Sequence, residues 1–477
     1  MKTVNNKRLL ISGMGFVIAC ACSGLVQAGQ MSADPLTFSQ AWQAALAQTP
    51  QMLKARARVA EAQGAVKAAR GHLLPKLQAS YTASGSDNAL NVFGMKLSQG
   101  KATFNDFGAS QFNPFKPQTL YVAPANLNNP GWYRNYESKL QLQIPVFNGG
   151  KVWAFYHKAQ AYLQAARMGD VAARQQLLLQ LLKAYEGVRT AKAFVKVAIK
   201  AEAAAKSFVD ITNKLYARGV VSRNAQLRAE LNFGDARLSL GKARAHLATA
   251  YEQLRILTGL PASKLIVVAQ SLRVKIPRAS LSELERAAQA ANPGTQALQM
   301  KLAGAQSGVW AARAAYLPHF NIVLSRQWDN TSAGLGGHPS NTVAGVLTWN
   351  LFDFGARRGA LDEAQAQVLQ QSAELRAARN KLRLQVATSW NDVHVAELRV
   401  RVRKLSIAQA KEALRLQKLR YEKGVATIAQ LLTAQAELNK ARSDLVAARY
   451  EEVMQRAGLL LALGRLTPQA IQASKLS

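Results

Sequence analysis

The sequence predicts an α+β chain in which one unit, a helix followed by a β-hairpin and a long helical hairpin, occurs twice. Three pairs of short segments recur in the same order along the chain, and the spacing between the copies changes at one place only. A duplication with a single insertion defines the architectural unit. The recurring pairs are 68–75 and 311–318, which both end in Leu-Pro; 147–150 and 352–355, which both end in Gly; and 216–220 and 421–425, which both read Tyr-x-x-Gly-Val.

Residues 1–28 have the features of a secretory signal peptide: early cations, an apolar stretch and a small-residue cleavage site ending at Ala28. The apolar stretch is too short for a membrane-spanning helix. Both cysteines, Cys20 and Cys22, lie in this segment, so cleavage after Ala28 leaves a mature chain without cysteine. The alternative is that residues 17–20 form a lipobox, with Cys20 as an acylated N-terminus.

The first unit is expected to begin with a short amphipathic helix over 36–48. Thr49-Pro50 then restarts the helix, with threonine as N-cap and proline at the first helical position, and Asn292-Pro293 does the same in the second unit. Each restarted helix should end just before a proline, at about Leu74 in the first unit and before Pro318 in the second, because the residue before proline avoids the helical conformation.

The hydrophobic period then changes from about 3.6 to 2, which predicts strands over 77–83, 136–146, 320–328 and 343–351. Each has apolar residues on one face and mostly polar residues on the other. Strands of roughly ten residues with this pattern are typical of a membrane β-barrel. A two-sheet sandwich or a soluble hairpin with one wet face would give the same pattern, and the strands alone do not decide between them.

Residues 86–134, rich in Asn, Phe, Gly and Pro, separate the first two strands, whereas 330–341 separate the other two. We therefore expect the insertion to form a long loop at a hairpin tip, where insertions are tolerated.

Two very long helices are expected after the strands, over 151–217 and 356–423, because neither segment contains proline. At 1.5 Å per residue each would be about 100 Å long. In the first, Leu178, Leu181 and Tyr185, followed by Val188, have the spacing of a coiled-coil seam.

The chain should turn back at Gly219 and at Gly424 into returning helices over 222–258 and 427–463, which are half as long. The N-terminal helix of each unit would supply the missing half of the outer arm. Segments 259–281 and 464–477 would then form a belt at mid-height. The predicted division is a signal peptide (1–28), a first repeat (29–260), an equatorial linker (261–280), a second repeat (281–466) and a C-terminal tail (467–477).

The motifs of common enzymes are missing from the sequence. Its six histidines include no pair at metal-ligand spacing, and there is neither HExxH, nor a P-loop, nor a G-x-S-x-G elbow. We therefore predict no catalytic residues, no metal site and no cofactor.

The formal net charge is +34, from 61 Lys and Arg against 27 Asp and Glu. The first interpretation of such a charge is that the protein binds nucleic acid. However, the cations are dispersed at helical spacing and follow an export signal, so we expect them to solvate helix faces, without a nucleic-acid partner. Our hypothesis is that the excess reflects an acidic external medium or contact with anionic lipid.

Taken together, the duplicated units, the Leu-Pro entry to the first strand, the Pro-Val-Phe-Asn-Gly-Gly exit from the second and the paired Tyr-x-x-Gly-Val turns resemble the TolC family of outer-membrane efflux proteins. The resemblance covers essentially the whole mature chain. It implies a homotrimer in the outer membrane, extending into the periplasm, in which a shared twelve-stranded β-barrel continues into an α-helical coiled-coil barrel. It also implies a periplasmic adaptor and an inner-membrane transporter at the helix tips, with the chain as the passive exit duct of an efflux or type I secretion system.

The resemblance assigns adaptor contact to Gly219, Val220, Gly424 and Val425 at the two turns. The simpler interpretation is that these residues only form turns, with glycine providing a positive φ. The two interpretations are compatible, because a turn must be exposed to be bound.

The resemblance also assigns closure of the entrance to Tyr421. The family's acidic constriction positions are occupied here by Gln430 and Thr433, and the tips carry cations instead. We therefore expect a weakly selective or anion-favouring constriction. The tip cations are Lys214, Arg218, Arg223, Lys418, Arg420 and Lys423.

The alternatives are a periplasmic membrane-fusion adaptor and a coiled-coil structural protein of the cell envelope. An adaptor would have one helical hairpin flanked by β-domains, and a coiled-coil spacer would need no alternating strands. The sequence predicts two hairpins and four strands.

Overall fold

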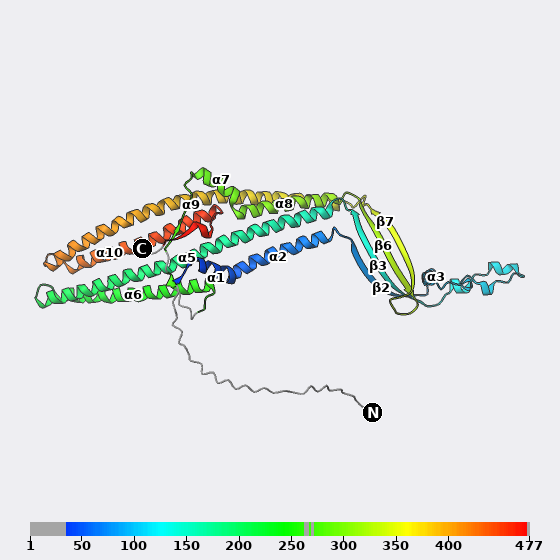
Figure 1. Cartoon of the computed structure of the whole chain (residues 1–477), viewed down its shortest axis with the longest axis horizontal. Helices are drawn as coiled ribbons and strands as arrows, with labels where there is room; N and C mark the ends of the chain where they lie inside the picture. Colours follow the sequence, from blue (N-terminus) through cyan, green and yellow to red (C-terminus); the bar gives the residue numbers. More distant parts are fainter. Residues whose placement is uncertain (1–34, 262–266, 269–270, 475–477) are drawn as a thin grey trace, which may run out of the picture.

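The computed structural model describes residues 35–261, 267–268 and 271–474 of the chain. The expected signal peptide, with Cys20 and Cys22, lies outside these residues, as does part of the expected equatorial linker. The described chain is elongated, with a long helical column at one end, a curved sheet beyond it, and a projecting segment between two of the strands at the far end (Figure 1). The same order of elements occurs in both halves of the chain.

Two long helical hairpins form the column. Helix α5 (Lys151–Ala217) pairs with α6 (Arg223–Thr258), and α9 (Ala356–Glu422) pairs with α10 (Ile428–Ala462). The long helices each contain 67 residues, which confirms their expected extent to within one residue. Each begins after a glycine with positive φ, Gly150 at 81° and Gly355 at 93°, so the chain changes direction sharply between strand and helix.

Shorter helices complete the outer arm of each unit. They are α1 (Phe38–Gln48) and α2 (Pro50–Gly71) in the first half, and α7 (Leu281–Ala291) and α8 (Pro293–Ala314) in the second. Helix α2 packs against α5, and α8 packs against both α5 and α9. The predicted outer arm of stacked half-length helices is thus present.

The caps at the two restarts differ from each other. Asn292 accepts hydrogen bonds from the backbone N–H groups of Gly294 and Thr295, as a helix N-cap should. Thr49 is the N-cap residue of α2 and Pro50 its first residue, as predicted, but the Thr49 side chain makes no capping hydrogen bond, because its hydroxyl donates to the carbonyl of Ala45 in the preceding helix. Helix α2 also ends three residues earlier than expected, at Gly71.

The four strands form one antiparallel sheet in the order β2-β3-β6-β7. The strands are β2 (Lys76–Ser86), β3 (Tyr133–Phe147), β6 (His319–Asn330) and β7 (His338–Thr348). Leu142 lies opposite Leu324, and Ile144 opposite Ile322, on one face of the sheet. Gln141 opposite Ser325 shows the polar character of the other face, which confirms the predicted alternation.

The fourth strand, predicted over 343–351, begins five residues earlier and ends three residues earlier than expected. It begins at His338 and ends at Thr348, so Trp349 and Leu351 lie beyond it. The Trp349 indole N–H donates to the carbonyl of Tyr316 at 3.1 Å, which fixes this side chain where the chain leaves the sheet. The connection between β6 and β7 is correspondingly short, residues 331–337.

The connection between β2 and β3, residues 87–132, is hereafter called the insert. The long connection expected over 86–134 is present with slightly different bounds, because β3 extends back to Tyr133, and it contains helices that the composition did not predict. Asn88 caps the first of them, accepting from the backbone N–H groups of Leu90 and Asn91. The helical segments are α3 (Ala89–Ser98), three 3-10 turns (Phe104–Phe107, Ala109–Gln111 and Pro117–Tyr121) and α4 (Ala125–Asn128).

Two small sheets lie beside the middle of the column and form the belt. Strand β1 (Pro35–Leu36) pairs in parallel with β4 (Val267–Val268), and β5 (Ser271–Val274) pairs antiparallel with β8 (Ile471–Ser474), which follows a 3-10 turn (Pro468–Ala470). The belt therefore joins the segment between the two units to the end of the second.

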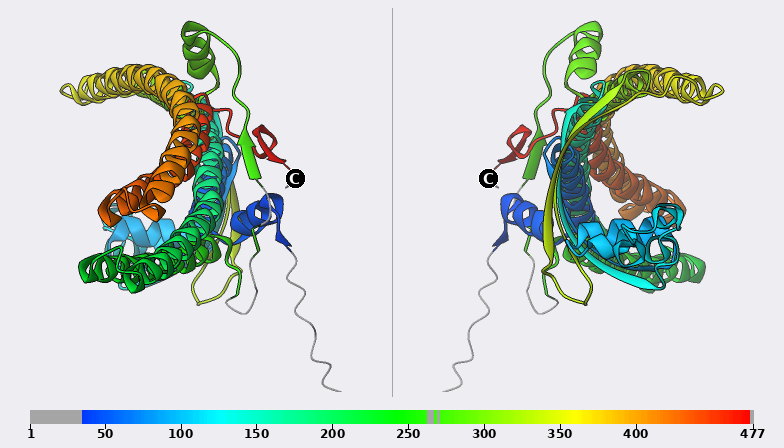
Figure 2. Two further views of the ribbon diagram at one scale, coloured as in Figure 1. Left: turned by 90° about the vertical axis from the view of Figure 1, so that its left-hand side faces the viewer. Right: turned by 90° about the vertical axis from the view of Figure 1, so that its right-hand side faces the viewer.

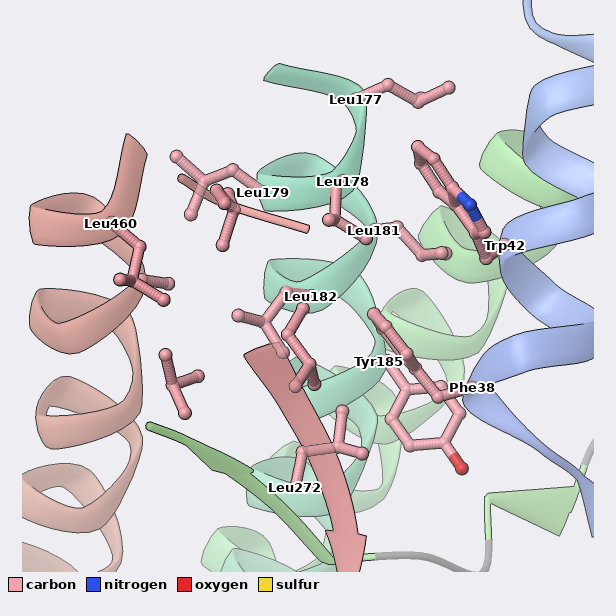
Figure 3. Close-up of a cluster of buried hydrophobic side chains, with 14 of the residues drawn as sticks. Phe38, Trp42, Leu177, Leu178, Leu179, Leu181, Leu182, Tyr185, Leu272 and Leu460 are labelled. Atoms are coloured by element: carbon pink, nitrogen blue, oxygen red, sulfur yellow. The ribbon is translucent and has the colours of Figure 1, made fainter. Parts of the chain in front are cut away.

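The main core lies where α1 and the belt pack against α5 (Figure 3). The Tyr185 ring meets Phe38 edge-on at 5.5 Å between ring centroids, and its hydroxyl donates to the Leu36 carbonyl at 3.0 Å. The predicted seam residues are all buried, but they belong to the same core as α1 and the belt strands instead of forming a seam confined to the long helices. These residues are Leu178, Leu181, Tyr185 and Val188.

A buried carboxylate attaches the belt to the column. Glu186 of α5 accepts the backbone N–H of Leu272 in β5 at 3.2 Å and the Arg189 guanidinium at 2.6 Å. Burial raises the pKa of the Glu186 carboxyl, and the hydrogen bond from Arg189 opposes this effect.

Among the described helices, we found none that combines the length and apolarity needed to cross a bilayer.

Candidate functional site

The two turns predicted as binding tips lie at the same end of the column (Figure 1). Gly219 and Gly424 have φ values of 71° and 75°. In each turn the glycine N–H bonds back three residues and the next N–H bonds back five, from Val220 to Leu215 at 2.9 Å and from Val425 to Arg420 at 2.9 Å. This is a Schellman motif, in which a left-handed residue closes the helix end.

The tips are exposed and touch each other. Val220 and Val425 are 52% and 68% exposed. A Cβ added at Gly424 would lie 3.5 Å from a Val220 methyl, whereas one at Gly219 would meet nothing within 4 Å. The structure therefore brings the four predicted tip residues into one surface, which is hereafter called the tip surface.

A small hydrophobic core beneath the tip surface holds the two hairpins together. It combines Phe208, Leu215 and Ala229 of the first hairpin with Tyr421, Ile428 and Leu431 of the second.

Tyr421 lies inside this core and is only 1% exposed. Its hydroxyl forms a 3.0 Å hydrogen bond with the hydroxyl of Thr212, which is fully buried in α5. The pair joins α9 to α5 and is the one direct polar link between the hairpins at this level among the described residues. Tyr216, which occupies the equivalent position in the first copy, is 42% exposed instead.

Gln430 and Thr433 lie on an exposed face of α10, away from Tyr421's core. Gln430 forms a capping box with Thr427, since its side chain accepts the Thr427 N–H at 3.0 Å. Thr433 donates to the Ala429 carbonyl at 2.9 Å. The structure therefore places these two residues together, but Tyr421 acts between helices and does not share their surface.

The tip surface is surrounded by cations. Among the predicted set, Lys418 approaches Glu422 at 3.9 Å, and Arg223 bonds the neutral side chain of Gln226. Lys214, Arg218, Arg420 and Lys423 are exposed around the same turns. The local potential at this end of the column is thus positive.

Sequence reasoning missed Thr212 and the contrast between the two tyrosines. Tyr216 and Tyr421 occur in the same motif, and only the packing of the second hairpin against the first distinguishes them. In the described part of the chain, no group of three or more His, Cys, Asp or Glu side chains could hold a metal ion.

Comparison with known proteins gives one consistent result. The model of a family described as "Outer membrane efflux protein" matches residues 41–260 and 284–465. Protein CyaE of Bordetella pertussis is 28% identical over 70% of this chain and 71% of its own length, and the outer membrane efflux protein BepC of Brucella suis is 25% identical over 69% and 72%. The solved structure of the outer membrane protein VceC of Vibrio cholerae superposes with a TM-score of 0.72 at 18% identity, covering 90% of this chain and 96% of that one.

Proposed function

Because the chain belongs to the outer membrane efflux protein family, as its matched residues establish, we propose that it is the passive exit duct of a tripartite export system. Its place is the outer membrane, with the helical column extending into the periplasm. In the proposed system an inner-membrane transporter provides the energy and a periplasmic adaptor docks on the tip surface. The observation that carries the proposal is a four-stranded sheet, apolar on one face, joined to a long helical column with exposed tips.

The apolar face and the aromatic side chains at its base support a membrane position for the sheet. Exposed aromatic residues gather where strands give way to long helices, as in the aromatic girdles of membrane barrels. Such side chains suit the boundary between lipid and water, because their rings are apolar but tolerate the polar interface. The residues are Trp153, Trp310, Trp349, Phe352 and Phe354, which are 55%, 64%, 57%, 72% and 93% exposed.

The two edge strands support a trimer. Within the described residues, β2 and β7 each pair on one side only. Unpaired backbone groups are not tolerated in lipid, so the sheet must close with other copies. The column is curved in the end views, so that its concave side would face a shared axis (Figure 2). Three copies would pool their strands into the twelve-stranded barrel that the family resemblance implies.

The proposal predicts a heat-modifiable trimer. Membrane-extracted protein in detergent should migrate as a trimer without heating and as a monomer after boiling, because barrel strands from three chains are hydrogen-bonded to one another. Gel mobility with and without heating, together with the mass of the detergent-solubilised protein, measures this. If the purified protein were a water-soluble monomer without detergent, both the trimer and its role as a membrane duct would be ruled out.

The cationic tips predict a constriction that does not favour cations. Reversal potentials of the purified protein in planar bilayers under a salt gradient should show weak selectivity or an anion preference. The double variant Arg218→Glu/Arg420→Glu should move the reversal potential toward cations. Arg376→Glu/Arg379→Glu, the same charge change on α9 far from the tips, serves as a control and should have a smaller effect. A strong cation preference of the unmodified channel would contradict the proposal.

If the hydrogen bond between the Tyr421 and Thr212 hydroxyls holds the entrance closed, removing the Tyr421 hydroxyl should weaken the packing of the tips. Tyr421→Phe leaves the buried Thr212 hydroxyl unpaired, which should destabilise the packed tips by about 1–2 kcal/mol and raise the channel's mean conductance. Thr212→Val/Tyr421→Phe removes both polar groups, so its tips should be closer to wild-type stability.

Single-channel recording measures the conductance change, and Tyr216→Phe is the matched control. Tyr216 has the same place in the first copy but is exposed, so its hydroxyl should contribute little. Equal conductance of the Tyr421 variant and this control would show that the buried bond does not hold the entrance closed.

A further inference from the structure

The insert is attached to the polar face of the sheet at the end remote from the helices. Glu137 lies opposite Asp329 in the sheet register, and Asn135 is two residues before Glu137, so all three side chains are on that face. The Asn135 amide donates to the Asp329 carboxylate at 2.7 Å. Asn135 and Asp329 are both buried, which shows that the insert covers this end of the polar face.

Gln99, just after α3, makes the attachment. Its amide N–H₂ lies 2.8 Å from the Asn135 side-chain oxygen and 3.0 Å and 3.2 Å from the carbonyls of Arg134 and Asn330. Its carbonyl accepts the Tyr133 hydroxyl at 2.9 Å. A buried network with every member bonded holds its parts in a fixed orientation. The insert is therefore joined to two neighbouring strands and is not a free loop.

The insert also has an interior of its own. Val92 is fully buried, and the rings of Phe93 and Phe107 meet edge-on at 5.2 Å. Lys96 and Asp106 form an ion pair at 2.6 Å, in which neither side chain is more than 18% exposed. These contacts tie α3 to the turn that follows it, so this part of the insert is packed on itself and on the attachment.

The insert exposes large apolar side chains. Phe104, Phe115 and Tyr121 are 88%, 91% and 90% exposed, and Leu120 is 67% exposed. Exposed apolar side chains in this number on one segment indicate a contact surface. Figure 1 places the insert beyond the sheet, and the end views place it on the concave side of the column (Figure 2).

We propose that the three inserts of the assembled channel meet over the pore and form an extracellular lid, held closed by the exposed apolar side chains of the inserts. The proposal rests on the trimeric duct proposed above. In a closed barrel the polar face lines the pore and the apolar face contacts lipid. A segment anchored on the polar face, on the concave side, therefore has the same segment of the other two copies as its neighbours. A second copy is thus the expected partner of Phe104, Phe115 and Tyr121.

Cysteine cross-linking tests the contact between copies. The two natural cysteines lie in the predicted signal peptide, so one introduced cysteine reports on its own position. Phe115→Cys in the intact trimer, treated with a short thiol cross-linker, should give a covalent dimer on a denaturing gel. Leu335→Cys in the turn between β6 and β7 is the control, since Leu335 is 81% exposed but lies outside the insert.

Replacement of the insert tests the lid itself. The chain provides its own short connection, so residues 87–132 can be exchanged for a copy of residues 331–337. The exchanged channel should form heat-modifiable trimers and show a clear rise in single-channel conductance, because the lid is gone. A second test variant is Phe104→Ser/Phe115→Ser/Tyr121→Ser, which keeps the anchoring network and should also raise conductance, because it removes the apolar contacts that hold the lid closed.

The lid would be refuted, and the duct left intact, if Phe115→Cys cross-linked no better than Leu335→Cys in trimers that dissociate normally on heating. Unchanged conductance after the exchange would overturn it equally. Loss of the trimer in the unmodified protein would instead refute the duct on which the lid rests.

Discussion

Gly424→Val is expected to abolish export while the channel still accumulates as a trimer in the outer membrane. Gly424 has φ of 75°, where a β-branched residue is strained by about 1–2 kcal/mol. A Cβ at this position would lie in van der Waals contact with a Val220 methyl, at 3.5 Å. The two further methyl groups of valine would therefore alter the surface that the turn shares with Val220. The change therefore acts directly on the tip surface where we propose that the adaptor docks.

Export assays and trimer abundance in outer-membrane fractions separate coupling from assembly for this variant. Gly241→Val is the matched control: it is also a helical-hairpin glycine with open space around it, but its φ is not positive. Gly424→Asn is a second control, because asparagine tolerates the left-handed conformation and should retain most export. Normal export by the valine variant would show that the adaptor does not depend on this turn for docking.

Glu186→Ala is expected to lower the stability of the protein by about 1–3 kcal/mol, the usual cost of leaving a buried hydrogen-bond donor unpaired, because the Arg189 side chain is partly exposed and can be solvated. The change leaves the Arg189 guanidinium without its carboxylate and the Leu272 N–H without its acceptor. Since Leu272 belongs to β5, the belt should detach from α5 before the column melts. Limited proteolysis at the belt and the midpoint of thermal unfolding by circular dichroism measure the two effects.

Glu186→Gln separates the hydrogen bond from the charge. Burial raises the pKa of Glu186 above its ordinary 4.5, so the folded protein binds this proton more tightly than the unfolded chain does. The stabilisation from protonation is fully present below pH 4.5 and is lost as the pH rises through the folded pKa. Glutamine cannot titrate, so the stability difference between wild type and Glu186→Gln should vary with pH in that window. A constant difference across it would contradict the raised pKa.

Local sequence signals predicted the column and the alternating strands. The long helices could be delimited because proline is missing from them and a glycine stands at each boundary, such as Gly150 before α5 and Gly219 after it. Strands β3 and β6 could be recognised because a half-buried sheet requires alternation on both partners. These signals are contained in consecutive residues, so no knowledge of distant contacts was needed.

Features that depend on distant contacts were not predictable in the same way. The first residues of β7, His338-Pro339-Ser340, do not alternate as an apolar strand does, and they extend because β6 is alongside. The insert's composition suggested an irregular loop, whereas Gln99 and the strand ends give it a fixed place. At the tips, nothing local to Tyr421 reveals that it is buried and bonded to Thr212 while Tyr216 is not.

The incomplete sheet has a consequence for gene dosage. A chain whose β2 and β7 each lack a partner cannot reach its final state by itself, so in the proposed trimer the yield of assembled channel depends on more than the first power of chain concentration. Channel number should then fall more steeply than protein synthesis when expression is reduced. Copies with a damaged edge strand, co-expressed with intact ones, should be dominant, because each mixed ring they enter would fail to close.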